Sequence, residues 1–232
     1  MIRLRPGGER GRTTLDWLDS RHTFSFGEYH DPGQMGFRSL RVLNDDRVAP
    51  GAGFPTHGHR DMEILSYALE GTLEHKDSLG NGSLIRPGEI QFMRAGTGVL
   101  HSEFNPSPTE PAHFLQIWIL PAERGLSPTY AQHAFERAAA REGFVLLASG
   151  EAGDGGIRLR QDASVYVTMP PPGRTCALRL AARRHAWVHL ARGAAIVNGH
   201  ALTAGDAAAF SEEPQIEITG QAEAELLVFD LA

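Results

Sequence analysis

Two short motifs carry side chains that could bind a metal ion. His57-Gly58-His59 places two imidazoles two positions apart, and His101-Ser102-Glu103 places an imidazole and a carboxylate at the same spacing. Side chains two positions apart on a β-strand point to the same face. Residues 60–100 can form three or four short strands with turns, which would return the second motif beside the first. We therefore predict a metal site with nitrogen and oxygen ligands from His57, His59, His101 and Glu103.

A second glutamate competes for the oxygen-ligand position. Glu63 has the same parity as His57 and His59, so an uninterrupted strand would place it on their face. A turn at residues 60–62 would break this alternation, and Glu63 or Asp61 could then orient an imidazole from behind. Spacing alone leaves both glutamates open.

The elements that must position these residues are short strands separated by turns. Apolar or alternating segments recur between turn signals such as Leu79-Gly80-Asn81-Gly82 and Ala95-Gly96-Thr97-Gly98. The predicted strands are 39–46 (ending in an acidic turn at Asp45-Asp46), 63–70, 72–77, 90–93, 99–104 and 113–120. Their spacing of about 8–12 residues is typical of an antiparallel sandwich or barrel.

The second half of the chain is again rich in strands and echoes the first. Glu70-Gly71 and Arg192-Gly193 each end a strand, while Pro87-Gly88-Glu89 and Ala204-Gly205-Asp206 each precede one. This weak repeat predicts two copies of one barrel, of which only the first carries a His-x-His triplet. Alanine and charge recur at helical spacing over residues 131–142. We predict an N-terminal domain with the metal site over 1–122, a partly helical linker over 123–143, and a C-terminal domain without a metal site over 144–232.

Composition narrows the class of protein. The chain has 232 residues, which is ample for two domains, and its 41% hydrophobic and 22% charged residues are typical of a globular protein. A formal charge of −6 argues against a nucleic-acid-binding surface. Cys176 stands alone, which fits a reducing compartment. Apolar runs fall short of the roughly 20 residues that span a bilayer, and the N-terminus lacks a signal-peptide core, so we expect a cytoplasmic protein without membrane contact.

Longer motifs resemble a known family. Gly51, His57, His59 and Glu63 resemble the first cupin motif, and Gly98, His101 and Asn105 resemble the end of the second. The stretches HGHRDMEILSYALEGTLEHKDSLGN and AGTGVLHSEFNPS resemble the pirin family of bicupins, including bacterial members described as quercetin 2,3-dioxygenases. The sequence departs from the general cupin pattern in two places: a glycine comes late, at Gly71, and Gly96 replaces a proline. Both departures resemble features of the pirin family. The resemblance covers most of residues 1–120 and, more faintly, the second half.

The resemblance implies a fold and a ligand set. The implied fold is all-β, a bicupin of two antiparallel β-barrels joined by the short linker, and two fused cupins lead us to expect a monomer. The ligands would be the residues matching His57, His59, His101 and Glu103, which favours Glu103 over Glu63. Iron is the usual metal of the family, so we expect one Fe2+; the ligand types also tolerate manganese, nickel, copper and zinc.

The resemblance also implies an activity. A flavonol such as quercetin would be opened at its heterocycle by O2, with release of CO. A divalent cation lowers the pKa of a bound hydroxyl, and Glu103 is the candidate catalytic base for that proton. The alternative within the family is a non-enzymatic metal-binding regulator that binds a protein partner.

The other histidines have structural interpretations. His75 could lie near the site, although a hydrogen-bonded or exposed strand residue is the simpler interpretation. His22, His30 and His113 could line a pocket but are interpreted as structural. Cys176 has no neighbouring histidine in sequence, so catalytic cysteine chemistry has little support.

Overall fold

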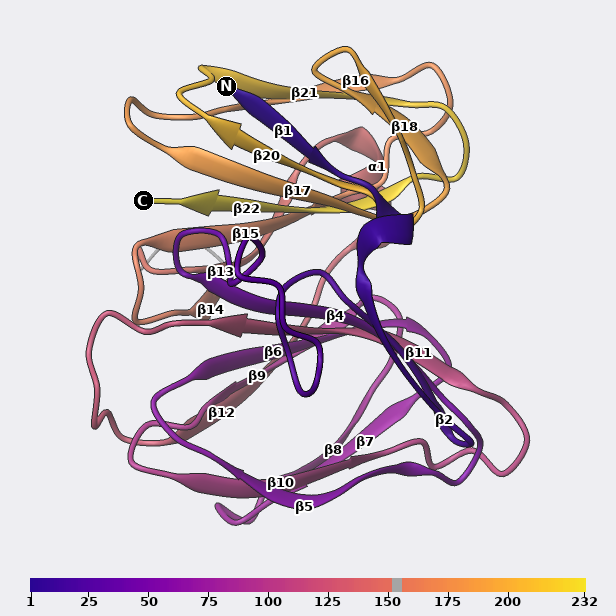
Figure 1. Ribbon diagram of the computed structural model, residues 1–232, viewed down its shortest axis with the longest axis vertical. Coiled ribbons are helices and arrows are strands. Elements are labelled where there is room, and N and C mark those ends of the chain that lie inside the picture. Colours follow the sequence, from indigo (N-terminus) through magenta and orange to yellow (C-terminus); the bar gives the residue numbers. More distant parts are fainter. Residues whose placement is uncertain (152–155) are drawn as a thin grey trace. The chain divides into compact units, whose positions relative to one another are not determined.

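The computed structural model describes residues 1–151 and 156–232, which group into two compact units. The N-terminal unit is Gly11–Ala134, and the C-terminal unit joins Met1–Arg10 to Phe135–Ala232 (Figure 1). Apart from the short 3-10 helix η1 (Gly7–Glu9) and helix α1 (Arg137–Glu142), the regular structure of the described residues is strand. The predicted all-β class is therefore confirmed. None of the described helices is long and apolar enough to cross a membrane.

The N-terminal unit contains two sheets with antiparallel pairing. The seven-stranded sheet has the order β12 (Thr129–Ala134), β9 (Glu89–Arg94), β6 (Glu63–Glu70), β11 (Ala112–Ile119), β4 (Leu40–Val48), β3 (Leu18–His22) and β2 (Gly11–Leu15). The four-stranded sheet has the order β5 (Gly53–His59), β10 (Val99–Phe104), β7 (Leu73–Asp77) and β8 (Gly82–Ile85). Both sheets have free edges, so the strands do not form one closed ring.

The C-terminal unit is built in the same way. Its seven-stranded sheet has the order β1 (Ile2–Arg5), β20 (Ala207–Ser211), β17 (His185–Arg192), β22 (Glu225–Leu231), β15 (Ala163–Thr168), β13 (Val145–Ser149) and β14 (Ile157–Arg158). Its four-stranded sheet has the order β16 (Thr175–Arg179), β21 (Gln215–Gly220), β18 (Ala194–Val197) and β19 (His200–Thr203). The β13–β14 pair is parallel.

The strand order reveals how far the internal repeat extends. The order β9-β6-β11-β4 corresponds to β20-β17-β22-β15, and β5-β10-β7-β8 corresponds to β16-β21-β18-β19. Eight consecutive strands, β4 to β11, thus have counterparts in β15 to β22. Strands β5 and β10, which carry the two metal-binding motifs, correspond to β16 and β21. There the buried side chains include Cys176, Ile216 and Ile218, so apolar packing occupies the corresponding positions.

The unit boundaries differ from the domain limits expected from the sequence. Strand β1 pairs with β20, from Ile2 opposite Phe210 to Arg5 opposite Ala207, and so belongs to the C-terminal unit (Figure 1). Residues 129–134 form β12 on β9 in place of the first part of a helix, and only Arg137–Glu142 is helical. Strands β1 and β12, which the sequence analysis does not predict, each pair with a strand that is distant in sequence. Local composition does not report such long-range hydrogen bonding.

The acidic turn expected at Asp45-Asp46 is instead part of a strand. Strand β4 continues to Val48 because β3 and β11 pair with it on both sides. Asp45 and Asp46 are consequently buried, at 5% and 3% exposure. Pairing on both sides overrides the low strand preference of aspartate.

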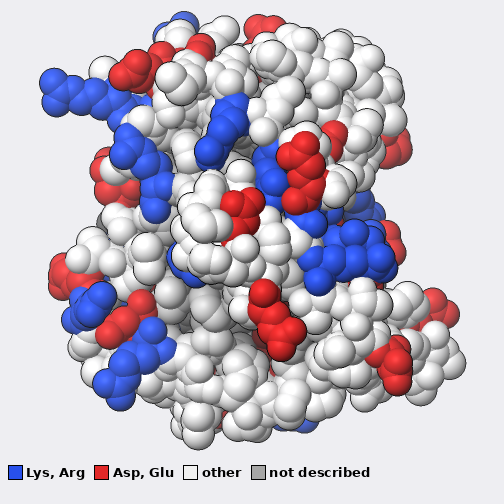
Figure 2. All heavy atoms as spheres, in the orientation of Figure 1, with Lys and Arg blue, Asp and Glu red and all other residues white. Residues whose placement is uncertain are grey.

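Charged side chains are mixed by sign on the surface. Figure 2 shows basic and acidic side chains interspersed over one face. Exposed ion pairs such as Arg12 with Asp19, at 3.0 Å, and Lys76 with Glu74, at 2.9 Å, illustrate this mixing.

Strand β10 lies between β5 and β7 and aligns the residues of the candidate site. His101 is opposite His57 on β5 and opposite Asp77 on β7. The β5–β10 register shifts between His101 and Glu103, at Pro55 and Thr56, a position where proline is tolerated because the ladder is interrupted. Beyond this bulge the strands approach closely at Gly53, where an added Cβ would lie 2.2 Å from the carbonyl oxygen of Glu103.

This close approach predicts that Gly53→Ala destabilises the N-terminal unit. The new methyl group meets backbone, which cannot rotate away, so we expect a loss of about 1–3 kcal/mol in the free energy of unfolding. Urea denaturation followed by tryptophan fluorescence measures the change. Gly82→Ala, in the same sheet, is the matched control because its added Cβ would have its nearest contacts at 4.0 Å. Equal stability of the two variants would contradict the prediction.

Candidate metal centre

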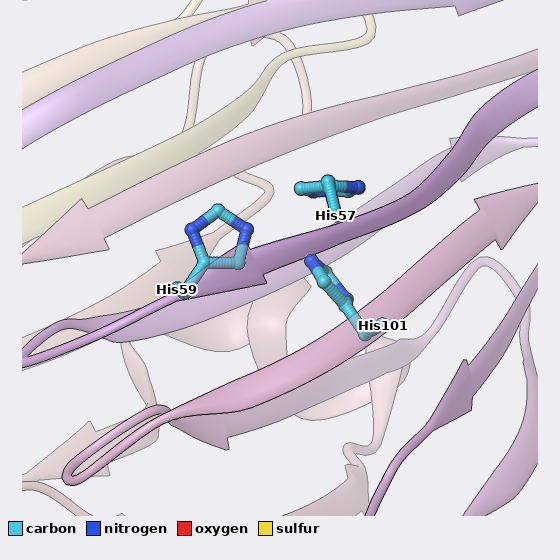
Figure 3. Close-up of side chains that lie close together, drawn as sticks. All are labelled: His57, His59 and His101. Carbon is cyan, nitrogen blue, oxygen red and sulfur yellow. The ribbon is translucent and has the colours of Figure 1, made fainter.

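The structure brings three of the predicted ligands together. The ring centroids of His57 and His101 are 4.4 Å apart, and those of His59 lie 4.8 Å from each of the other two. One nitrogen from each ring lies within 4.8 Å of the others. Figure 3 shows the rings of His57 and His59, from one strand, and His101, from its neighbour, approaching one another. The three imidazoles can therefore share one cation.

Hydrogen bonds define which nitrogen of His57 is available. Its Nδ1 lies 2.8 Å from the carbonyl oxygen of Pro55, at the bulge in β5. A carbonyl oxygen only accepts, so Nδ1 carries the proton and donates it. The Nε2 atom then has a free lone pair, the form in which imidazole binds metals.

His101 offers an independent test of whether these residues fit a metal. Its side chain is 2% exposed, and its Nε2 has no hydrogen-bond partner among the described residues. An unpartnered buried nitrogen is costly unless another group satisfies it. A cation held between the three rings would do so, and this observation fits a metal centre.

Glu103 is held beside the same cluster. Its carboxylate has an oxygen within 4.8 Å of a nitrogen of His101, in a second group of potential ligands that also includes His75. Ser66 Oγ donates to Oε1 at 2.9 Å, and Gln116 Nε2 donates to Oε2 at 2.6 Å. Each carboxylate oxygen has two lone pairs, so these bonds fix the side chain and leave capacity for a cation.

The competing carboxylates lie elsewhere. Glu63 is fully buried on β6, opposite Arg94 of β9, and belongs to neither group of potential ligands in the described part of the chain. Asp61 has a φ of 51° and accepts a hydrogen bond from the backbone of Gly125 at 2.7 Å. The turn suspected at residues 60–62 therefore does interrupt the alternation.

The environment keeps the imidazoles neutral. Burial, followed by the proximity of His101 and His57, lowers the pKa of His59 to about 4. Burial, together with His57 and His75, lowers the pKa of His101 to about 3. Both rings are therefore unprotonated at neutral pH and can bind a cation without first losing a proton.

A cavity of about 380 Å3 opens onto this cluster and is lined by both His57 and His59 as well as Glu103. Two aromatic residues line it: the rings of Phe26 and Trp118 meet edge to face at 5.4 Å, and Trp118 also contacts His59 at 4.9 Å. Polar side chains also line the cavity, including Ser20, His22, Asn44, Asp46 and Gln116. The cavity can thus accept a flat aromatic molecule that carries polar groups.

Comparisons with known proteins now identify the family. The pirin model matches residues 5–119, and the model of the quercetinase C-terminal cupin domain matches residues 146–231. This chain belongs to the pirin family. The bicupin fold predicted from the sequence is confirmed by these two matches.

Relatives of this pirin match it over their whole length. Quercetin 2,3-dioxygenase of Escherichia coli strain K12 is 46% identical over 231 residues, covering 100% of this chain and 99% of the relative. The crystal structure of YhhW from Escherichia coli has a TM-score of 0.95, 45% identity and coverage of 100% and 98%. A structure of bacterial pirin YhhW from the same organism in complex with nickel(II) has a TM-score of 0.94 at 45% identity, covering 100% of this chain and 99% of that one.

The remaining histidines of this pirin have distinct environments. His22 lines the cavity, with Nε2 2.8 Å from Thr13 Oγ1 and Nδ1 2.9 Å from Asn44 Oδ1. His113 lies 2.7 Å from Asp45, and His30 is exposed. His75 is hydrogen-bonded, as expected, and is also fully buried beside His101.

Sequence reasoning missed several polar residues of the cavity, among them Asp46 and Gln116. The acidic pair Asp45-Asp46 predicts a turn, although Arg47 and Val48 continue the strand pattern beyond it. Gln116 interrupts the apolar segment 113–120, and a polar side chain within such a segment was the available signal. The partner of Gln116 could not be deduced, because it depends on how β10 packs against the other sheet.

The depressed histidine pKa values predict a pH effect on the metal-free protein. The unfolded chain binds protons at these rings below about pH 6.5, whereas the folded chain does so only near pH 3–4. Stability contributed by His101 is therefore present above pH 6.5 and is lost as the pH falls towards 3. We expect His101→Phe to gain stability relative to the parent between pH 7 and pH 5, measured by urea denaturation in chelator. A difference independent of pH would contradict this expectation.

Proposed function

We propose that this pirin is a metal-dependent dioxygenase that opens the heterocycle of a flavonol such as quercetin with O2 and releases CO. The observation that carries this proposal is the convergence of His57, His59 and His101 at an aromatic-lined cavity. The full-length match to a protein named quercetin 2,3-dioxygenase supports the reaction class. In this proposal the metal and the substrate bind next to each other in the cavity of the N-terminal unit.

In this proposal His57, His59, His101 and Glu103 hold one divalent cation. The nickel complex of a relative supports a divalent ion, and Fe2+ is the metal we propose for this chain. When bound, the cation supplies Lewis acidity, which lowers the pKa of a coordinated hydroxyl. A mixed imidazole and carboxylate set suits several transition metals, so metal analysis of the purified protein is required.

The cavity walls would orient the substrate. The rings of Phe26 and Trp118 offer aromatic surfaces to a flat polyphenol, while polar side chains of the same cavity offer hydrogen bonds to its hydroxyls. Glu103 is the proposed base, because Ser66 and Gln116 donate hydrogen bonds to its two oxygens and hold the side chain at the cavity.

Asp46 is a second carboxyl group at this cavity. Burial is the main reason that its pKa is raised to about 7; Asp45 and Glu103 add to this, and a hydrogen bond with Ser20 opposes it. Its Oδ1 is buried and has no hydrogen-bond partner within the described residues. Asp46 can therefore hold a proton near neutral pH and exchange it with a substrate hydroxyl.

The proposed reaction predicts oxygen-dependent bleaching of quercetin. The metal-loaded protein should remove its visible absorbance under air and not under argon. His57→Ala and His101→Ala should each lose most of the bound metal and reduce turnover at least about 100-fold, because each removes a ligand. Metal analysis and absorbance measure both effects.

His30→Ala is the control, since that side chain is exposed and does not line the cavity. A fully metal-loaded protein without oxygen-dependent bleaching would instead favour the non-enzymatic regulator. Gel filtration with light scattering would test the monomeric state, which stays a prediction.

The position of Asp46 predicts that Asp46→Asn lowers kcat/KM for quercetin about 10–100-fold, because the amide cannot exchange a proton. The variant should also report on stability. Burial raises the pKa of Asp46 in the folded protein to about 7 from its ordinary value of 3.8, so the parent loses stability as the pH rises from about 4 to 7. Urea denaturation of the metal-free proteins should therefore show Asp46→Asn becoming more stable relative to the parent as the pH rises from about 4 to 7. The exposed Asp16→Asn is the control, and equal kcat/KM values would rule out the role of Asp46.

A further inference from the structure

A buried pair of side chains lies behind His101. His75 Nδ1 is 3.4 Å from His101 Nδ1, and His75 Nε2 is 3.0 Å from Asp77 Oδ2. His75 and Asp77 belong to β7, and both side chains have 0% exposure. The chain of contacts thus runs from Asp77 through His75 to His101, whose Nε2 is the unpartnered nitrogen of the cluster.

The order of donors along this chain is set at its outer end. A carboxylate only accepts hydrogen bonds, so His75 Nε2 donates to Asp77. A neutral His75 then has a lone pair on Nδ1, which can accept from His101 Nδ1. His101 must accordingly carry its proton on Nδ1 and present a bare Nε2 to the cluster.

We propose that Asp77 and His75 are positioning residues that hold His101 in this tautomer and strengthen Nε2 as a metal ligand. The inference rests on the metal site of the proposed function, although it requires no particular substrate. Metal-binding histidines generally donate their second N–H to an acceptor that orients the ring. Here the acceptor is the imidazole of His75, which is itself oriented by the carboxylate of Asp77.

Neighbouring contacts hold the pair without help from a metal. Burial raises the pKa of Asp77, but hydrogen bonds from His75 and Asn81 and from the backbone of Leu79 and Asn81 produce a net lowering. These bonds keep Asp77 ionised and fix it at the start of the turn. Tyr130 stacks on His75 with ring centroids 5.0 Å apart, and its hydroxyl contacts Ser83.

The C-terminal unit offers a comparison. Strand β18, the counterpart of β7, has Ala195 and Val197 as its buried residues, and both lie in an apolar cluster with Ile216 and Ile218 of β21. Strand β21 is the counterpart of β10. Strand β21 thus carries no histidine ligand, and its neighbour β18 carries no counterpart of the His75–Asp77 pair.

Asp77→Asn tests the proposal sharply. Its amide NH2 would donate to His75 Nε2, which moves the proton of His75 to Nδ1 and turns that atom towards His101 as a donor. His101 would then shift its proton to Nε2 and lose the lone pair that faces the cluster. We expect nickel(II) affinity of the metal-free protein to fall about 10–100-fold, measured by calorimetry.

A second readout is independent of metal and of activity. In 15N-histidine NMR spectra of the metal-free protein, His101 should be protonated on Nδ1 in the parent and on Nε2 in Asp77→Asn. His75→Phe keeps an aromatic ring next to Tyr130 but removes the acceptor, so it should also weaken nickel binding. His113→Phe is the matched control, because His113 has the same type of partner in Asp45 and no described hydrogen bond to the cluster.

Nickel affinity within twofold of the parent in both Asp77→Asn and His75→Phe, or an unchanged His101 tautomer in Asp77→Asn, would overturn the proposal. Failure of the proposed function is distinguishable. A protein that binds nickel with the expected dependence on Asp77 but does not bleach quercetin would retain this inference and lose the dioxygenase assignment.

Discussion

The antiparallel pairing of β10 with both β5 and β7 is the constraint on which the candidate site depends. One register places His101 beside His57, and the other places it beside Asp77, so a single strand aligns the cluster and its buried support. A slip of one residue would turn His101 and Glu103 to the opposite face. Gly53 and the bulge at Pro55 let the strands approach closely while keeping this register.

Local sequence was informative where chemistry follows strand periodicity. The parity of His57 with His59, and of His101 with Glu103, was enough to predict one shared site, and the family resemblance favoured Glu103 over Glu63. The turn at Asp61 shows why parity alone was insufficient, because a single residue at positive φ ends the alternation. All-β architecture likewise followed from the spacing of turns and apolar segments.

The features that sequence did not reveal depend on contacts between distant segments. Asp46 is buried because strands on both sides of β4 extend past it, although its residue type favours a turn. His75 gains its position from Asp77 on its own strand, from His101 on the next and from Tyr130 on a third. Neither environment has a local signature, since each requires the sheets to be assembled first.

Strand β1 has a consequence for biosynthesis. Its partner β20 is synthesised about 200 residues after it. At about 5–20 residues per second, β1 would wait roughly 10–40 s before its backbone could pair with β20. The seven-stranded sheet of the C-terminal unit therefore cannot be complete until β20 has been synthesised, however early β1 is made.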